Sequence, residues 1–175
     1  MQTHVESEQR HPRVQQTCDR ALRMMSQGAP RREILTQLVA SAEHVSGGRS
    51  VASILVVDRE GLLRNGASPG LPADYLDAID RLRPNPQLGT CAAAAATGEI
   101  VLTPDFCADS KWAELRHLPL ALGFVGAWSH PIKAADGRVL GTFGTYYRER
   151  REPTPEEREA VRALASVAAL VIEAS

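Results

Sequence analysis

The sequence predicts an α+β domain in which a central antiparallel sheet lies between helices. Residues 51–57 are β-branched and almost continuously apolar, as is typical of a central strand covered on both faces. An Asp136-Gly137 pair separates two later strand-like segments and indicates a tight hairpin. Helical patterns with a 3.6-residue period precede the first strand and follow the last one. A chain of 175 residues is long enough for one such domain.

Composition narrows the classes of function. The hydrophobic fraction of 43% suits a packed core, and a net charge of −1 gives no electrostatic support for nucleic-acid binding. The longest apolar stretches fall short of the ~20 residues that a membrane span needs. The first residues lack the pattern of a secretory signal, and three widely spaced cysteines do not form a disulfide framework. We therefore expect a cytoplasmic protein with neither a nucleic-acid nor a membrane partner.

Two helices are predicted before the first strand. Residues 1–12 are polar and predict a flexible tail, whereas residues 13–28 predict a helical arm that Gly28 ends. A second helix begins at Pro30 and stops at Gly47-Gly48. These boundaries divide the chain into the tail, the arm and one domain over residues 29–175.

The middle of the chain predicts short elements. After the strand at 51–57, a turn leads to a hairpin partner that begins at Leu62, and a short helix carries Tyr75. Five alanines at 92–96 predict a helix that can lie very close to a neighbour. Residues 99–102 are expected to form an edge strand.

A further helix is expected with its N-cap at Asp109 or Ser110, broken or kinked at Pro119 and ended by Gly123. Strands over 124–132 and 139–147 follow.

A capping box predicts where the last helix begins. Thr154-Pro155-Glu156-Glu157 places a capping hydroxyl before a proline at the first helical position. The helix that follows is apolar almost all round over 167–172, so one face is surplus to the core. We expect the N- and C-terminal helices to form a dimerisation bundle.

Several motifs occur in a fixed order from about Pro30 to the end of the chain. They include Gly89-Thr90-Cys91, Asp109-x-x-Trp112, Trp128-Ser129-His130-Pro131-Ile132, Gly137-Arg138-Val139-Leu140-Gly141-Thr142-Phe143 and Tyr146-Tyr147-Arg148. In that order the motifs resemble the GAF domain family, in particular the bacterial subgroup of sensor kinases, cyclases and small-anion sensors such as nitrate sensors. Ala92 and Ala127 depart from the glycine and cysteine that are usual in that subgroup.

The resemblance implies a buried ligand pocket between the sheet and the helices that cross one of its faces. The positions that match this pocket are Gly89, Thr90, Cys91, Ala92, Pro104, Trp128, His130 and Tyr146. A helix that begins at Thr90 or Cys91 would offer free backbone N–H groups and the positive end of its dipole to an anion. The best guess for the ligand is a small anion, with nitrate first.

Strand alternation places Trp128 and His130 on one face, opposite Ala127 and Ser129. Trp128 and Tyr146 are expected to line or cap the pocket, with a plain core role as the alternative for Trp128. His130 could ligate haem iron or respond to pH, but no second ligand accompanies it, so no metal site is predicted.

The resemblance implies a sensory domain rather than an enzyme. It would signal through its terminal helices, as a homodimer, to a sensor kinase or a fused output domain. One alternative is a free methionine-R-sulfoxide reductase that uses Cys91 and Cys107, since that branch of the family carries cysteines around the same pocket. A second alternative is a dimerisation module without a ligand.

Overall fold

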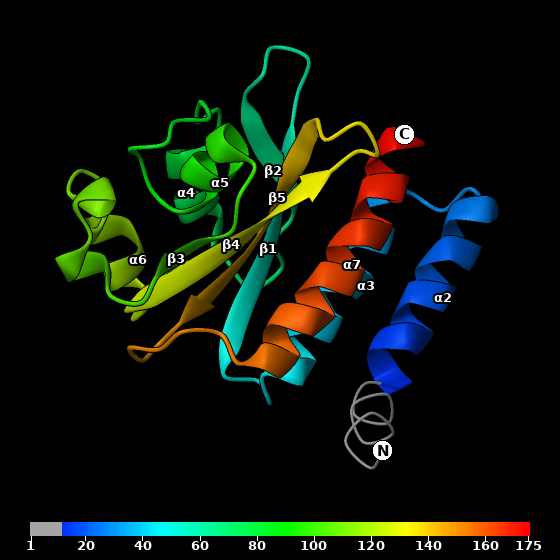
Figure 1. Cartoon of the computed structure of the whole chain (residues 1–175), viewed down its shortest axis with the longest axis horizontal. Helices are drawn as coiled ribbons and strands as arrows, with labels where there is room; N and C mark the ends of the chain where they lie inside the picture. Colours follow the sequence, from blue (N-terminus) through cyan, green and yellow to red (C-terminus); the bar gives the residue numbers. More distant parts are fainter. Residues whose placement is uncertain (1–11) are drawn as a thin grey trace.

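The computed structural model describes residues 12–175 and confirms the α+β fold (Figure 1). The predicted flexible tail lies outside the described residues, except for Pro12, with which the first helix begins. In chain order the elements are α2 (Pro12–Ser26), α3 (Arg31–Val45), β1 (Ser50–Val57), β2 (Leu63–Ala67), α4 (Ala73–Ile79), α5 (Cys91–Thr97), β3 (Val101–Thr103), the 3₁₀ turns η1 (Phe106–Ala108) and η2 (Ser110–Trp112), α6 (His117–Ala121), β4 (Gly126–Lys133), β5 (Val139–Tyr147) and α7 (Pro155–Glu173).

The sheet has five antiparallel strands in the order β2-β1-β5-β4-β3. The predicted central strand is confirmed, because β1 pairs with β2 on one side and with β5 on the other. The predicted hairpin is also confirmed: β4 and β5 pair on either side of the turn at Gly137, which has a φ of +88°. The last strand of the chain, β5, therefore lies in the middle of the sheet.

Helices cover both faces of the sheet (Figure 1). We call the face covered by α2, α3 and α7 the bundle face, and the face covered by α4, α5, α6 and the two 3₁₀ turns the pocket face. The main core lies on the bundle face, where apolar side chains of the three helices meet Ile54, Phe143 and Trp128 of the sheet. Two smaller clusters lie on the pocket face, and they surround the candidate site.

The predicted start of α7 with its Thr154 cap is confirmed, but the reciprocal half of the capping box is not formed, because the Glu157 carboxylate binds Tyr147 and Arg151 instead. The Glu157 backbone N–H donates to Thr154 Oγ1 at 3.1 Å, and Pro155 occupies the first turn. The surplus apolar face expected on this helix is mostly absent, because α2 and α3 of the same chain pack against it. Only Leu170 stays substantially exposed, at 49%, among the large apolar side chains of α7. The bundle therefore forms within one chain, and its dimerisation stays a prediction.

The segment between β3 and β4 differs from the single helix that was expected. Asp105 and Asp109 each cap a separate 3₁₀ turn by accepting from a backbone N–H two residues later. Pro119 neither breaks nor kinks a helix, because it lies in the first turn of the short helix α6, where no N–H is needed. Gly123, with a φ of +84°, follows the end of α6 as predicted. No helix among residues 12–175 is long and apolar enough to cross a membrane.

Candidate ligand-binding site

Neighbouring residues of β4 and β5 point to opposite faces, so these strands serve two separate cores. On β5, Tyr146 packs on the pocket face, whereas Tyr147 packs on the bundle face. On β4, Ala127 lies on the pocket face and Trp128 on the bundle face. Any ligand held on the pocket face therefore meets Tyr146 and not Trp128.

A small, partly open cavity lies on the pocket face, between the sheet and α4, α5 and η2. Its volume of about 20 Å³ leaves room for about one water-sized molecule. None of its lining residues carries a formal charge, and most are apolar. They are Leu55, Tyr75, Ile79, Leu82, Leu88, Gly89, Thr90, Cys91, Ala92, Trp112, Leu115 and Tyr146.

Two tyrosine hydroxyls meet at this cavity. Tyr75 Oη on α4 and Tyr146 Oη on β5 lie 2.8 Å apart, and their rings pack edge to face. Both side chains are almost completely buried. Burial raises the pKa of Tyr75 and of Tyr146 well above the ordinary tyrosine value. Both groups therefore stay protonated hydroxyls at physiological pH.

A directed chain of hydrogen bonds fixes the wall beside α5. The Trp112 indole N–H donates to Thr90 Oγ1 at 2.8 Å, and Thr90 Oγ1 lies 2.9 Å from Thr103 Oγ1. Thr103 in turn donates to Asp109 Oδ2 at 3.1 Å. Burial acts to raise the pKa of Asp109, but hydrogen bonds from Lys111 outweigh it and the pKa is lowered. The chain thus ends on an ionised carboxylate that Lys111 neutralises at 2.9 Å.

The floor of the cavity is formed by Cys91 and the strands below it. Ser129 Oγ donates to Cys91 Sγ at 3.6 Å, and the Thr142 hydroxyl also lies near this sulfur. A Cβ added to Gly144 would lie 3.0 Å from the same atom, so glycine lets α5 approach the sheet closely. Burial raises the pKa of the Cys91 thiol, with the two hydroxyls acting in the opposite direction. Cys91 is therefore a protonated thiol at neutral pH.

Comparison with known proteins identifies the family of this fold. The model of the GAF domain family matches residues 28–173, which is most of the chain. The chain belongs to the GAF domain family. A methyl sulfide methyltransferase-associated sensor of Methanosarcina acetivorans is 35% identical over 156 residues. That match covers 89% of this chain but 16% of the relative, so the chain spans a small part of that protein.

Solved structures show the same fold. The GAF domain of a phosphoenolpyruvate-protein phosphotransferase of Coxiella burnetii aligns with a TM-score of 0.72 at 17% identity, covering 91% of this chain and 92% of that one. A free methionine-R-sulfoxide reductase of Neisseria meningitidis aligns with a TM-score of 0.71 at 17% identity, covering 97% and 92% of the two chains. At these identities the likeness concerns the fold alone.

The GAF domain brings five of the eight expected site residues to the cavity. They are Gly89, Thr90, Cys91, Ala92 and Tyr146. Pro104 does not line the cavity. Its carbonyl oxygen instead packs against Gly126, where an added Cβ would lie 2.4 Å from that oxygen.

Trp128 and His130 do not line the cavity, contrary to the expectation from the sequence. The expectation that Trp128 shares a pocket with Tyr146 is wrong, because Trp128 is in the bundle-face core and its indole N–H donates to Tyr147 Oη at 2.9 Å. His130 follows the same alternation and lies near α7. Both faces of β4 are buried, so the pattern of its residues could not tell which face carries the cavity.

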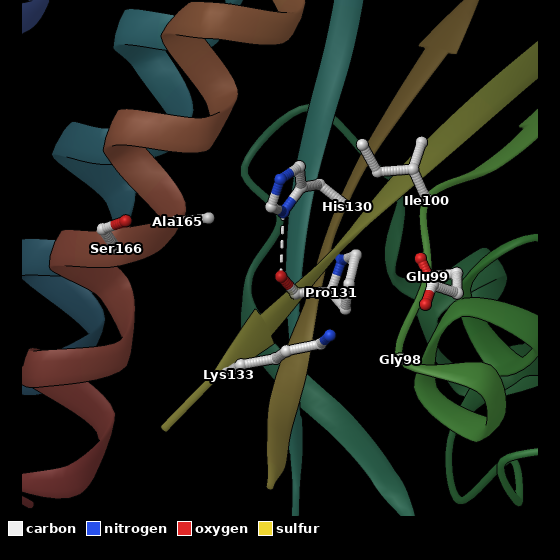
Figure 2. Close-up of a pocket in the computed structure, with 8 residues that line it drawn as sticks. All are labelled: Gly98, Glu99, Ile100, His130, Pro131, Lys133, Ala165 and Ser166. Carbon is white, nitrogen blue, oxygen red and sulfur yellow. Dashed lines mark hydrogen bonds between the residues drawn. The ribbon is translucent and has the colours of Figure 1, made fainter. Parts of the chain in front are cut away.

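His130 lines a separate groove of about 280 Å³ that is open to solvent, between α7 and the turn after α5 (Figure 2). Figure 2 shows its ring between Ala165 of α7 and Ile100, with Nδ1 directed at the Pro131 carbonyl oxygen, 2.8 Å away. Lys133 and Glu99 lie at the rim. No group of three or more potential metal ligands occurs within residues 12–175.

The environment of His130 predicts a pH effect on stability. Burial lowers its pKa, and the charges of Lys133 and Arg162 act in the same direction, against the hydrogen bond to Pro131. The unfolded chain therefore binds a proton before the folded GAF domain does as the pH falls below ~6.5. We expect the stability contributed by neutral His130 to be lost through that range, and a His130→Asn variant to show a smaller loss in denaturant unfolding.

The exposed His117 supplies the control, since a His117→Asn variant should keep the wild-type pH profile. Equal profiles for all three proteins would contradict the prediction.

Three site residues were missed or undervalued in the sequence. Each of them belongs to a stretch that matches the GAF family: Tyr75 ends residues 71–75, Trp112 ends the Asp109-x-x-Trp112 motif, and Thr142 lies in residues 137–143. The resemblance identified these stretches but assigned none of the three residues to the pocket.

Proposed function

We propose that this GAF domain is a sensory module that binds a small molecule in the pocket-face cavity and passes the bound state to α7. The observation that carries the proposal is the lining of the cavity, which pairs an apolar surface with a few oriented polar groups, as ligand sites do. A relative named as a sensor is consistent with this role. The eight residues expected from the sequence are reduced in this proposal to Gly89, Thr90, Cys91, Ala92 and Tyr146, joined by Tyr75 and Trp112.

Nitrate remains the first ligand to test. It is planar, small and singly charged, and the cavity has no lining cation that would favour a more highly charged anion. The site must open before nitrate can enter, since about 20 Å³ accepts little more than water. The helix α4, which carries Tyr75, is seven residues long and follows a loop with Pro69 and Pro72, so we propose that it is the element that moves.

Thermal unfolding tests the proposal directly. A ligand at ~100 times its dissociation constant adds about 2.7 kcal/mol to the free energy of unfolding, which shifts the transition clearly. We expect one of nitrate, nitrite, chloride, cyclic nucleotides and methionine sulfoxide to raise the melting temperature of wild-type protein, and a Tyr75→Phe/Tyr146→Phe variant to lose that response. A panel without any response would favour the alternative of a ligand-free dimerisation module.

The reductase alternative is less well supported by the geometry of the cysteines. Cys91 is a protonated thiol on the cavity floor, whereas Cys107 is exposed on η1 and no contact joins the two. A thiol exchange reaction needs an attacking thiolate and a second thiol within reach. We therefore propose a role that is not enzymatic.

Thiol labelling provides a quantitative check. At pH 7.5, one thiol of the native protein should react with an aromatic disulfide reagent at least about tenfold faster than the other two, because burial raises the pKa of Cys91 and of Cys18. A Cys107→Ser variant should lose the fast phase. Fast labelling of Cys91 would instead favour the reductase.

Output through α7 is the second part of the proposal. The exposed residues of α7 include Glu159, Ala163, Ser166, Leu170 and Glu173, whose spacing alternates between four and three residues. The spacing matches the a and d positions of a heptad, but only Ala163 and Leu170 among them are apolar. We therefore propose that α7 pairs with its counterpart in a homodimer through a short contact centred on Leu170. Sedimentation equilibrium of the wild-type and Leu170→Glu proteins tests this contact, and a monomeric wild type would contradict it.

We further propose a domain boundary, a partner and a cellular location for this module. The GAF domain occupies residues 29–175, with α2 as an added helical arm. Its partner is a sensor kinase or a fused output domain, and it acts in the cytoplasm within a two-component pathway.

A further inference from the structure

The two tyrosine hydroxyls at the cavity carry one more hydrogen-bond donor than the bond between them uses. Each hydroxyl carries one proton, and a single hydrogen bond between Tyr75 and Tyr146 uses one of the two. Within residues 12–175 neither hydroxyl has another hydrogen-bond partner. One O–H therefore has no acceptor among the described residues, and the cavity that it borders, with room for about one water-sized molecule, is where an acceptor can be supplied.

The floor of the cavity supplies no strong acceptor for this proton. Ser129 donates to Cys91 Sγ, and the completely buried Thr142 hydroxyl lies near the same sulfur. Sulfur is a weak acceptor, and two hydroxyls already share that of Cys91.

Two other buried networks of this domain do not show the surplus, although Thr145 Oγ1, away from the cavity, is a buried hydroxyl without a hydrogen-bond partner among the described residues. The chain from Trp112 through Thr90 and Thr103 ends on the Asp109 carboxylate. The chain from Trp128 through Tyr147 ends on the Glu157 carboxylate. Each carboxylate accepts the last proton, so every donor in these two chains is used. No carboxylate lines the cavity beside Tyr146.

We infer that the ligand of this cavity is a small molecule that presents hydrogen-bond acceptor atoms and no donors, and that the Tyr75 and Tyr146 hydroxyls bind those atoms. This inference rests on the proposed function and narrows its ligand to a chemical class. The class contains oxyanions such as nitrate and neutral oxo compounds such as ketones. If entry separates the two tyrosines, the second proton also becomes available to the ligand.

Two planar probes of similar shape distinguish a cavity that binds acceptor groups from one that binds donor groups. Nitrate has only acceptors and guanidinium has only donors, and acetone adds a neutral acceptor. The protein contains two tryptophans, and each gives one indole signal in a ¹H–¹⁵N spectrum. Trp112 lines the cavity, whereas Trp128 lies on the bundle face and serves as an internal control.

We expect nitrate or acetone to shift the Trp112 signal in a saturable titration, while millimolar guanidinium leaves it unchanged. The Tyr75→Phe/Tyr146→Phe variant should bind the acceptor probe at least about fivefold more weakly, which corresponds to the loss of one net hydrogen bond. Tyr147→Phe, which removes the neighbouring hydroxyl on the bundle face, should leave the affinity unchanged.

The outcomes separate the inference from the proposed function. A shift of Trp112 by guanidinium alone, or equal affinity for the acceptor probe in the wild-type and double-phenylalanine proteins, would overturn the ligand class and leave a ligand-binding cavity in place. If a compound of the thermal-unfolding panel that carries donors, such as methionine sulfoxide, shifts Trp112 while none of the three probes does, the ligand class fails and the binding cavity stands. If no compound shifts Trp112, both fail.

Discussion

Replacing Glu157 with alanine is expected to lower the free energy of unfolding by about 3 kcal/mol, because it breaks a buried charge pair by removing one partner. Glu157 is only 6% exposed and accepts a hydrogen bond from Tyr147 Oη at 2.5 Å. Arg151 forms an ion pair with the same carboxylate and lies over the Tyr147 ring, 4.2 Å from its centroid. The pair therefore holds the start of α7 against β5.

The substitution leaves two groups without partners. The Arg151 guanidinium has a side chain only 17% exposed, and its remaining acidic neighbour is Glu149 at 3.7 Å. The Tyr147 hydroxyl would lose the acceptor of its proton. Because Glu149 and solvent compensate part of the loss, the expected cost lies at the lower end of the range for a broken buried pair.

Denaturant unfolding of Glu157→Ala and Glu159→Ala measures the effect with a control on the same helix. Glu159 pairs with Arg162 at the surface, with both side chains at least 60% exposed. Surface pairs of this kind contribute ~0.5 kcal/mol or less. Similar losses in the two variants would show that the Glu157 network contributes little.

Glu157 also illustrates what the sequence could predict. The Thr154-x-x-Glu157 spacing predicted a helix start, because a capping box depends only on local chain geometry. The partners of Glu157 are Tyr147 and Arg151, and whether a carboxylate is buried by them depends on how the linker after β5 folds back. The sequence therefore indicated the cap and not the buried network.

At the candidate site, too, the sequence predicted some features, whereas contacts between distant segments determined others. The small residues from Gly89 to Ala92 and Tyr146 could be placed near a pocket through the family resemblance. The pairing of Tyr75 with Tyr146 could not, since these residues are 71 positions apart and α4 shows only a core-like stripe. Trp128 was misplaced because both faces of β4 are buried, which removes the polar side that normally identifies the inner face of a strand.

Gly141→Ala is expected to cost about 3 kcal/mol, at the upper end of the range for overpacking a core. A Cβ added to Gly141 would lie 2.2 Å from the Leu55 carbonyl oxygen and 3.2 Å from the Val56 Cα. Both atoms belong to the backbone of β1, which pairs with β5 along most of its length. Relief of the clash therefore requires the two central strands to separate, and no side-chain rotation can provide it.

Gly144→Ala, on the same strand, is the matched control. Its added Cβ would meet Cys91 Sγ at 3.0 Å, and a cysteine side chain can move by a few tenths of an ångström. We expect a loss of about 1 kcal/mol there, which a second change of Cys91 to alanine should recover in part because it removes the sulfur. If Gly141→Ala were no more destabilising than Gly144→Ala in the same denaturant series, β1 and β5 would have to be less tightly paired than the structure indicates. The difference between the two variants thus separates a backbone constraint of the sheet from the packing of one side chain on the cavity floor.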